Sequence, residues 1–185
     1  MIAGPQRDVE RCDGCGVELA DEHAHLAEPG TRVLRCACSA CALTLTGPRG
    51  VRLKRVRRRV QRLLDGRISA ATWAALGVPV GLAFFVRRSS GIVALYPSPA
   101  GVLEADVTSA AWNAVITDHP SLADLEDDVE ALLVHRLHGT DAAYRVSVDL
   151  CYRLAGIVRL YWRGLGGGPA LAQQVRAFFE ELDRG

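Results

Sequence analysis

Residues 12–41 read CDGCGVELADEHAHLAEPGTRVLRCACSAC and hold five of the six cysteines of the chain. Two C-x-x-C pairs bracket the stretch, Cys12 with Cys15 and Cys38 with Cys41. Each pair can turn two thiolates toward one ion, and four thiolates complete the tetrahedral shell that zinc takes in structural sites. The spacing therefore predicts a small treble-clef or ribbon-like module that is closed around a metal.

This stretch offers more candidate ligands than a tetrahedral site needs. Cys36 can replace Cys38, although C-x4-C is a looser spacing, and His25, or less readily His23, can replace one thiolate. The residues at 21–25 have a simpler interpretation as a polar surface loop, and buried free thiols are the competing interpretation of the cysteines. An all-thiolate site also suits iron. We predict zinc, with iron as the alternative, bound by Cys12, Cys15, Cys38 and Cys41.

Size and composition indicate a globular protein. The chain has 185 residues, of which 49% are hydrophobic, enough for one domain and a small module. The longest apolar run, at 77–86, has about ten residues, whereas a membrane-spanning helix needs roughly 20. No apolar core follows the first residues, so we expect no secretory signal and a cytoplasmic location. Clustered cysteines in a reducing compartment favour metal binding over disulfides.

The net charge of +1 conceals a basic segment. Residues 49–67 hold nine arginines and lysines and one acid, Asp65. Such a segment is a solvated face or a docking surface for an anionic partner, either an acidic protein or a nucleic acid. Leu53, Val56 and Val60 recur at helical spacing, which favours a helix over the later part of the segment, with Gly66 as its C-terminal cap.

The remaining sequence mixes strand and helix patterns, which predicts an α+β fold with a mainly antiparallel sheet, packed helices and an N-terminal zinc-ribbon-like or zinc-knuckle module. A breaker at 47–50 separates the module from the rest. We divide the chain into a metal-binding module at 1–47, a basic connector at 48–67 and an α+β domain at 68–185. Strands are expected at 80–86, 91–96, 129–136 and 143–148, and helices at 70–76, 108–118, 149–163 and 170–182.

Several sequence patterns of enzymes are absent. The chain contains neither the G-x-x-x-x-G-K-[ST] phosphate loop nor the G-x-S-x-G nucleophile elbow. His119, His135 and His138 are scattered without a partnered nucleophile, and Cys151 lies far from the other cysteines on an expected helix. We therefore expect a protein that is not an enzyme.

Five further stretches carry a resemblance. They are GVPVGLAFFV at 77–86, ALYPSPAG at 94–101, LEDDVEALLV at 125–134, CYRL at 151–154 and WRGL at 162–165. Together with the cysteine module, they resemble an uncharacterised actinobacterial family that is typically encoded beside nickel–iron uptake hydrogenases and their maturation factors. The resemblance extends over about residues 11–182. It implies a genomic neighbourhood and no known activity.

These features together favour a non-enzymatic, zinc-binding accessory or assembly protein, associated with nickel–iron hydrogenase and binding a hydrogenase subunit or maturation factor. One alternative is a nucleic-acid-binding regulator that combines the zinc module with an arginine-rich arm, whose affinity would fall steeply with salt. The other is a rubredoxin-like iron electron carrier, which colour would reveal.

Overall fold

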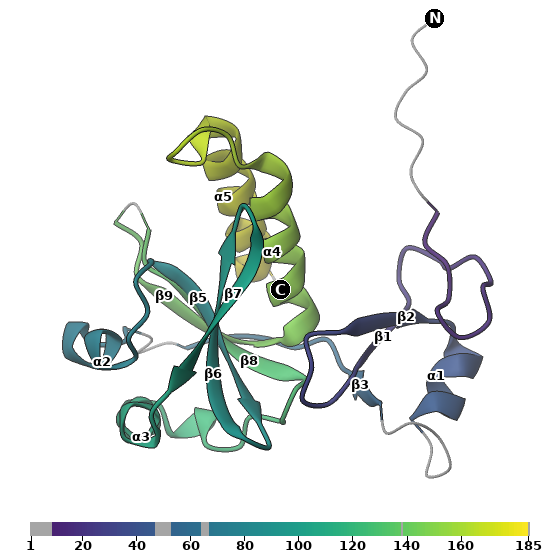
Figure 1. Ribbon diagram of the computed structural model, residues 1–185, viewed down its shortest axis with the longest axis horizontal. Coiled ribbons are helices and arrows are strands. Elements are labelled where there is room, and N and C mark those ends of the chain that lie inside the picture. The colour runs from purple at the N-terminus through teal and green to yellow at the C-terminus, as the bar shows by residue number, and fades with distance from the viewer. Residues whose placement is uncertain (1–8, 47–52, 64–66, 138, 185) are drawn as a thin grey trace, which may run out of the picture. The chain divides into compact units, whose positions relative to one another are not determined.

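The computed structural model describes residues 9–46, 53–63, 67–137 and 139–184 (Figure 1). The chain divides into two compact units, Met1–Arg57 and Arg58–Gly185. The breaker at 47–50, which we expected to separate two domains, lies outside the described residues. Each unit has its own sheet, and the α+β class with antiparallel strands is confirmed.

The first unit is a three-stranded antiparallel sheet with one short helix. Strand order is β2-β1-β3. Leu26 is fully buried at the centre of a small apolar cluster that also includes Ala37, Ala42 and Leu53. So few apolar side chains stabilise a fold weakly, which is why such modules depend on a metal. The elements are β1 (Ala24–Ala27), β2 (Leu34–Ala37), α1 (Ser39–Leu45) and β3 (Lys54–Val56).

The second unit is built on a six-stranded antiparallel sheet with the order β4-β9-β8-β5-β6-β7. The strands expected at 80–86 and 91–96 are present as β5 and β6 and form a hairpin, in which Val86 pairs with Val93. Central strands β8 and β9 are buried along their whole length. The strands are β4 (Val60–Arg62), β5 (Leu82–Arg88), β6 (Gly91–Ser98), β7 (Gly101–Val107), β8 (Glu130–His135) and β9 (Ala142–Ser147).

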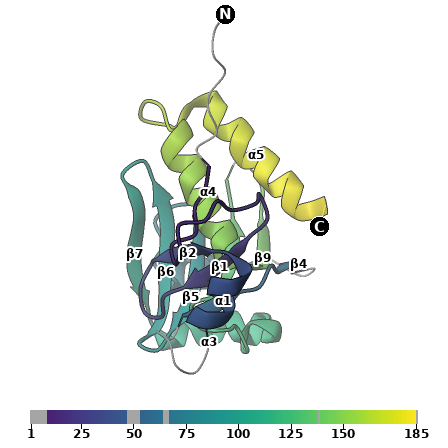
Figure 2. The ribbon, with the colours of Figure 1, turned by 90° about the vertical axis from the view of Figure 1, so that its right-hand side faces the viewer.

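Helices cover both faces of this sheet (Figure 1). Phe84 and Phe85 are neighbours on β5 and therefore point to opposite faces. Phe85 packs against Trp112 on one face, and Phe84 against Tyr152 on the other. The first face carries α2 (Ala70–Ala75), α3 (Ser109–Asp118) and the 3-10 turn η1 (Pro120–Leu122). The second carries α4 (Val148–Tyr161) and α5 (Gly168–Arg184) (Figure 2).

One strand, β7, was not predicted from the sequence. No strand was expected between 91–96 and 129–136, yet β7 lies there and pairs with β6 from Ser98↔Gly101 to Ile92↔Val107. Gly101 has φ +121°, which permits the tight reversal. β7 exposes Glu104 and Asp106 at the sheet edge. Its mixed composition therefore lacks the apolar run by which the buried strands were recognised.

The helix expected in the basic segment is wrong for the residues that the structure describes. Two short strands occupy it instead, β3 in the first sheet and β4 in the second. Val56 pairs with His25 of β1, and Val60 pairs with Val146 of β9. Only a few apolar residues matched the helical spacing, and the pairing of Val56 and Val60 with strands of the two sheets overrode it. Gly66, the expected cap, lies outside the described residues.

Two arginines of this segment form ion pairs within the second unit. Arg59 donates to Glu130 at 2.7 Å and Arg62 to Asp183 at 3.2 Å. Arg145, 4% exposed, also binds Glu130 and donates to Asp124 at 2.6 Å. These contacts join β4 to α5, and β9 to the start of β8 and the loop before it.

Candidate metal centre

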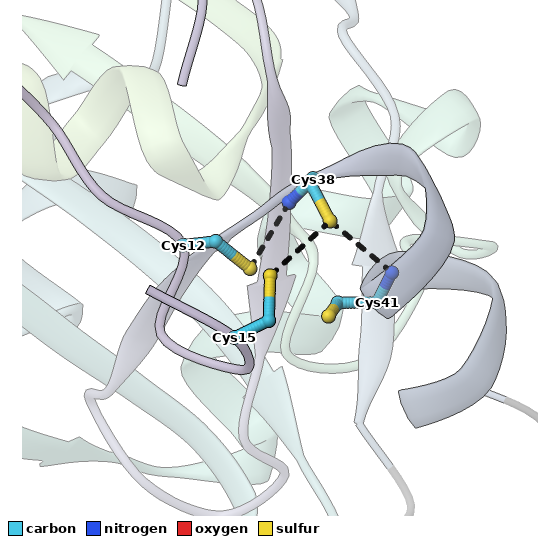
Figure 3. A group of neighbouring side chains, drawn as sticks. All are labelled: Cys12, Cys15, Cys38 and Cys41. Carbon is cyan, nitrogen blue, oxygen red and sulfur yellow. Dashed lines mark hydrogen bonds between the residues drawn. The ribbon is translucent and has the colours of Figure 1, made fainter. Parts of the chain in front are cut away.

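The first C-x-x-C pair lies on a tight turn. The amide of Gly16 donates to the carbonyl of Cys12, and the amide of Cys12 donates to the carbonyl of Val17, each at 2.8 Å. Gly16 has φ +75°, a conformation that glycine adopts without steric cost. The turn brings the side chains of Cys12 and Cys15 to the same side of the loop (Figure 3).

The second pair lies where β2 leads into α1. Cys38 is the N-cap of α1, and its Sγ accepts a hydrogen bond from the Cys41 amide at 3.4 Å. The Cys38 amide in turn donates to Cys12 Sγ at 3.3 Å, so the two turns are joined directly (Figure 3). The module thus consists of a knuckle turn, a hairpin and a helix, and the start of the helix supplies the second cysteine pair. This arrangement is that of a treble clef, one of the two kinds of module, treble-clef or ribbon-like, that the spacing predicted.

The four sulfurs lie at the separations that a tetrahedral ion requires. They are all within 4.8 Å of one another. The Sγ atoms of Cys15 and Cys38 are 3.8 Å apart. Sulfurs bound at about 2.3 Å to one zinc would be roughly 3.8 Å apart, whereas a disulfide needs about 2.05 Å. The donor set therefore fits a metal, either zinc or iron, and all these cysteines are unbridged.

Proton affinities within the cluster are strongly unequal. The hydrogen bond from the Cys38 amide, chief among several, lowers the pKa of Cys12 to about 6. Hydrogen bonds with Cys15, Cys38 and Cys12 raise the pKa of Cys41 to about 12. One thiol is thus ionised near neutral pH while another holds its proton. A divalent ion would displace that proton on binding, because only thiolates are zinc ligands.

The four-thiol group contains neither Cys36 nor His25, the two preferred alternative ligands that the sequence left open. They form a second group with His23, with one ligand atom from each residue within 4.8 Å of the others. His25 belongs to β1, so the expected polar loop is a strand at this position. His23, the less favoured of the two histidines as a substitute ligand, belongs to this group as well. The H-x-H spacing, which returns both rings to one face of an extended chain, was the clue to their pairing.

The second unit holds a cavity of about 770 Å³. Tyr144 Oη donates to Asp183 at 3.0 Å, and burial together with this bond raises the pKa of Tyr144 to about 12. His135 stacks on Phe179 with ring centroids 4.1 Å apart. Cys151 lies apart from the cavity lining in α4, where burial raises its pKa well above that of an ordinary thiol. The polar side chains that line the cavity include Arg62, His135, Tyr144, Arg176, Glu180 and Asp183.

None of the described helices is both long and apolar enough to cross a bilayer.

Comparison with known proteins gave no match among curated proteins and none among solved structures. A family model does match residues 11–185, nearly the whole chain and both units. The chain therefore belongs to the family of unknown function DUF5947.

Proposed function

We propose that this protein is a non-enzymatic accessory or assembly factor whose N-terminal module is held together by zinc. The observation that carries the proposal is the closed set of four thiols, Cys12, Cys15, Cys38 and Cys41. Four protein ligands fill the tetrahedral shell of zinc and leave no position for a substrate or an activated water. A site of this kind stabilises a fold and presents its surface to a partner.

Two arginines provide the surface that we assign to docking. Arg57 and Arg58 are exposed, and neither forms a hydrogen bond or ion pair within the described ranges. Arg59, by contrast, is bound to Glu130, and Arg62 to Asp183. Guanidinium groups pair with carboxylates in bidentate geometry, so an acidic protein surface suits them.

The partner that we propose is a nickel–iron hydrogenase subunit or one of its maturation factors, and the location is the cytoplasm. The sequence resemblance over residues 11–182 supports the partner. The clustered, unbridged cysteines suit the reducing cytoplasm. Hydrogenase assembly requires metal delivery, cluster insertion and subunit docking. A small adaptor whose fold is stabilised by zinc suits each of these tasks.

The docking proposal can be tested with purified hydrogenase subunits and maturation factors. Arg57→Glu with Arg58→Glu should weaken binding at least ten-fold while the circular dichroism spectrum and zinc content stay unchanged. Arg159→Glu with Arg184→Glu is the matched control, because it makes the same change in charge at exposed positions of α4 and α5. Equal loss of binding in both double variants would mean that net charge alone matters and would refute the assigned surface.

The same arginines suit phosphates, which keeps a nucleic-acid-binding regulator as the second candidate. Its signature would be sub-micromolar binding to random duplex DNA at physiological salt that the double variant abolishes. That result, without binding to any hydrogenase protein, would replace the adaptor proposal. A red protein with iron in the four-thiolate site would instead favour the rubredoxin-like carrier.

A further inference from the structure

His23, His25 and Cys36 occupy one face of the β1–β2 hairpin. His25 and Cys36 are direct partners in the antiparallel register, so their side chains project from the same face. His23 lies two residues before His25, and the alternation of an extended chain returns its side chain to that face. The two imidazole rings meet edge to face with centroids 4.8 Å apart.

The opposite face of the hairpin belongs to the module core. Leu26 and Ala37 follow His25 and Cys36 by one residue each and are buried in the apolar cluster beside Cys12 and Ala42. One ligand group is therefore built on each side of the strand pair. Cys36 belongs to the histidine group and is not a spare ligand for the four-thiol site.

His23 is oriented as a metal-binding histidine would be. Its Nδ1 lies 3.0 Å from the carbonyl oxygen of Ala20, which makes Nδ1 the protonated nitrogen and leaves Nε2 with a lone pair. The side chain is 6% exposed, yet Nε2 has no hydrogen-bond partner within the described part of the chain. Leaving a buried polar atom without a partner destabilises the fold, and a bound cation would remove that cost.

The surroundings of the group are negative. Glu10 Oε2 lies 3.5 Å from His23 Nε2. Asp13 Oδ2 accepts a hydrogen bond from the Cys36 amide at 2.7 Å. Both carboxylates favour a cation at this place, and Glu10 is near enough to complete a fourth position after a small movement of its exposed side chain.

We propose that His23 Nε2, His25 and Cys36 Sγ bind a second metal ion, separate from the four-thiol site. Two imidazoles and one thiolate select a borderline divalent ion such as Zn²⁺ or Co²⁺ over Mg²⁺ or Ca²⁺. Three protein ligands leave one coordination position for Glu10, water or an exogenous ligand. The ion is consequently exchangeable, whereas the four-thiol site holds its ion tightly. This site goes beyond the adaptor role and does not depend on it.

Metal titration of the full chain tests the proposal. Protein loaded with one equivalent of Zn²⁺ should take up one equivalent of Co²⁺ and show a single-thiolate charge-transfer band. Cys36→Ser should abolish that band, and His23→Asn should lower Co²⁺ affinity at least ten-fold, while both retain the tight Zn²⁺. Glu22→Gln is the matched control, because Glu22 is exposed beside His23 and outside the ligand group.

Other outcomes overturn the proposal. Uptake of only one metal by the unaltered chain would do so, as would a Co²⁺ band that survives both Cys36→Ser and His23→Asn. Cys15→Ser separates the two sites, because it removes a ligand of the four-thiol group alone. Loss of the tight Zn²⁺ in Cys36→Ser but not in Cys15→Ser would assign Cys36 to the first site and contradict the division described above.

Discussion

The Cys38 amide donates a hydrogen bond to Cys12 Sγ at 3.3 Å, which joins two turns 26 residues apart in the chain. The bond lowers the pKa of Cys12 and fixes the approach of α1 to the knuckle. The protein thus brings the two C-x-x-C turns together through its backbone as well as through a shared ion. This contact explains why the sulfurs already lie at metal-binding separations.

Zinc affinity should rise with pH. Cys12, with a pKa of about 6, is a thiolate at neutral pH, but Cys41, with a pKa of about 12, is a thiol whose proton zinc must displace. Protons are therefore released on binding, and lower pH favours the metal-free state. Calorimetric titration in buffers of different ionisation enthalpy measures the number released. A pH-independent affinity with no proton release would contradict this assignment.

Gly14→Ala should weaken metal binding. A Cβ at Gly14 would lie 2.9 Å from Cys41 Sγ and 3.2 Å from Cys41 Cβ, so the first turn must move away from α1. Overpacking of this kind costs about 1–3 kcal/mol, which corresponds to roughly five-fold to over a hundred-fold in zinc affinity. Competition with a chromophoric chelator measures the change.

Gly156→Ala is the control for that substitution. Gly156 is exposed in α4 and a Cβ there meets nothing within 4 Å, so the same chemical change should leave zinc affinity unaltered. Helix propensity predicts a gain in stability of up to about 1 kcal/mol. Equal effects of the two alanines on zinc affinity would show that contact with Cys41 is irrelevant.

Arg145→Met should destabilise the second unit by about 3–5 kcal/mol, because it leaves Glu130 buried without its main counter-charge. Arg153→Met is the control. Arg153 pairs with Glu181 at the surface, where an ion pair contributes about 1 kcal/mol or less. Urea unfolding of the two variants should separate them clearly, and similar losses would contradict the importance given to the buried network.

The same network predicts that stability falls in acid. Hydrogen bonds from Arg145 lower the pKa of Asp124, and contacts with Arg145, the Glu126 amide and Arg59 lower that of Glu130 despite its burial. A carboxyl with a depressed folded-state pKa stabilises the fold above its unfolded value, and loses that contribution as pH falls through the folded value. Unfolding free energies measured at descending pH should decline less steeply in Glu130→Gln than in the unaltered chain.

The sequence predicted those parts of the fold that local patterns specify. Continuous apolar runs located β5, β6, β8 and β9. In the structure α2 and α3 begin at capping residues, since Ser69 and Thr108 accept hydrogen bonds from the amides of Thr72 and Ala111. The edge strand β7 and the connector strands β3 and β4 were missed. Their pairing depends on sheets formed by distant residues, and short basic or acidic strands carry little local pattern.

The doubled C-x-x-C motif predicted which cysteines lie together, since the structure gathers Cys12, Cys15, Cys38 and Cys41 in one group. That they bind a metal stays a prediction. The placement of Cys36 and His25 in a different group could not be foreseen without the register of β1 and β2, which pairs them. The burial of Glu130 could not be foreseen either, because it depends on pairing with Arg145 from a later strand.

Metal analysis of the chain, purified without added metal and passed through a chelator by gel filtration, tests the central claim most directly. One zinc per chain should remain, bound by the four thiolates, and Cys15→Ser or Cys41→Ser should abolish it and loosen residues 12–46. Iron in place of zinc, or a metal-free chain whose N-terminal unit is nevertheless folded, would contradict the account.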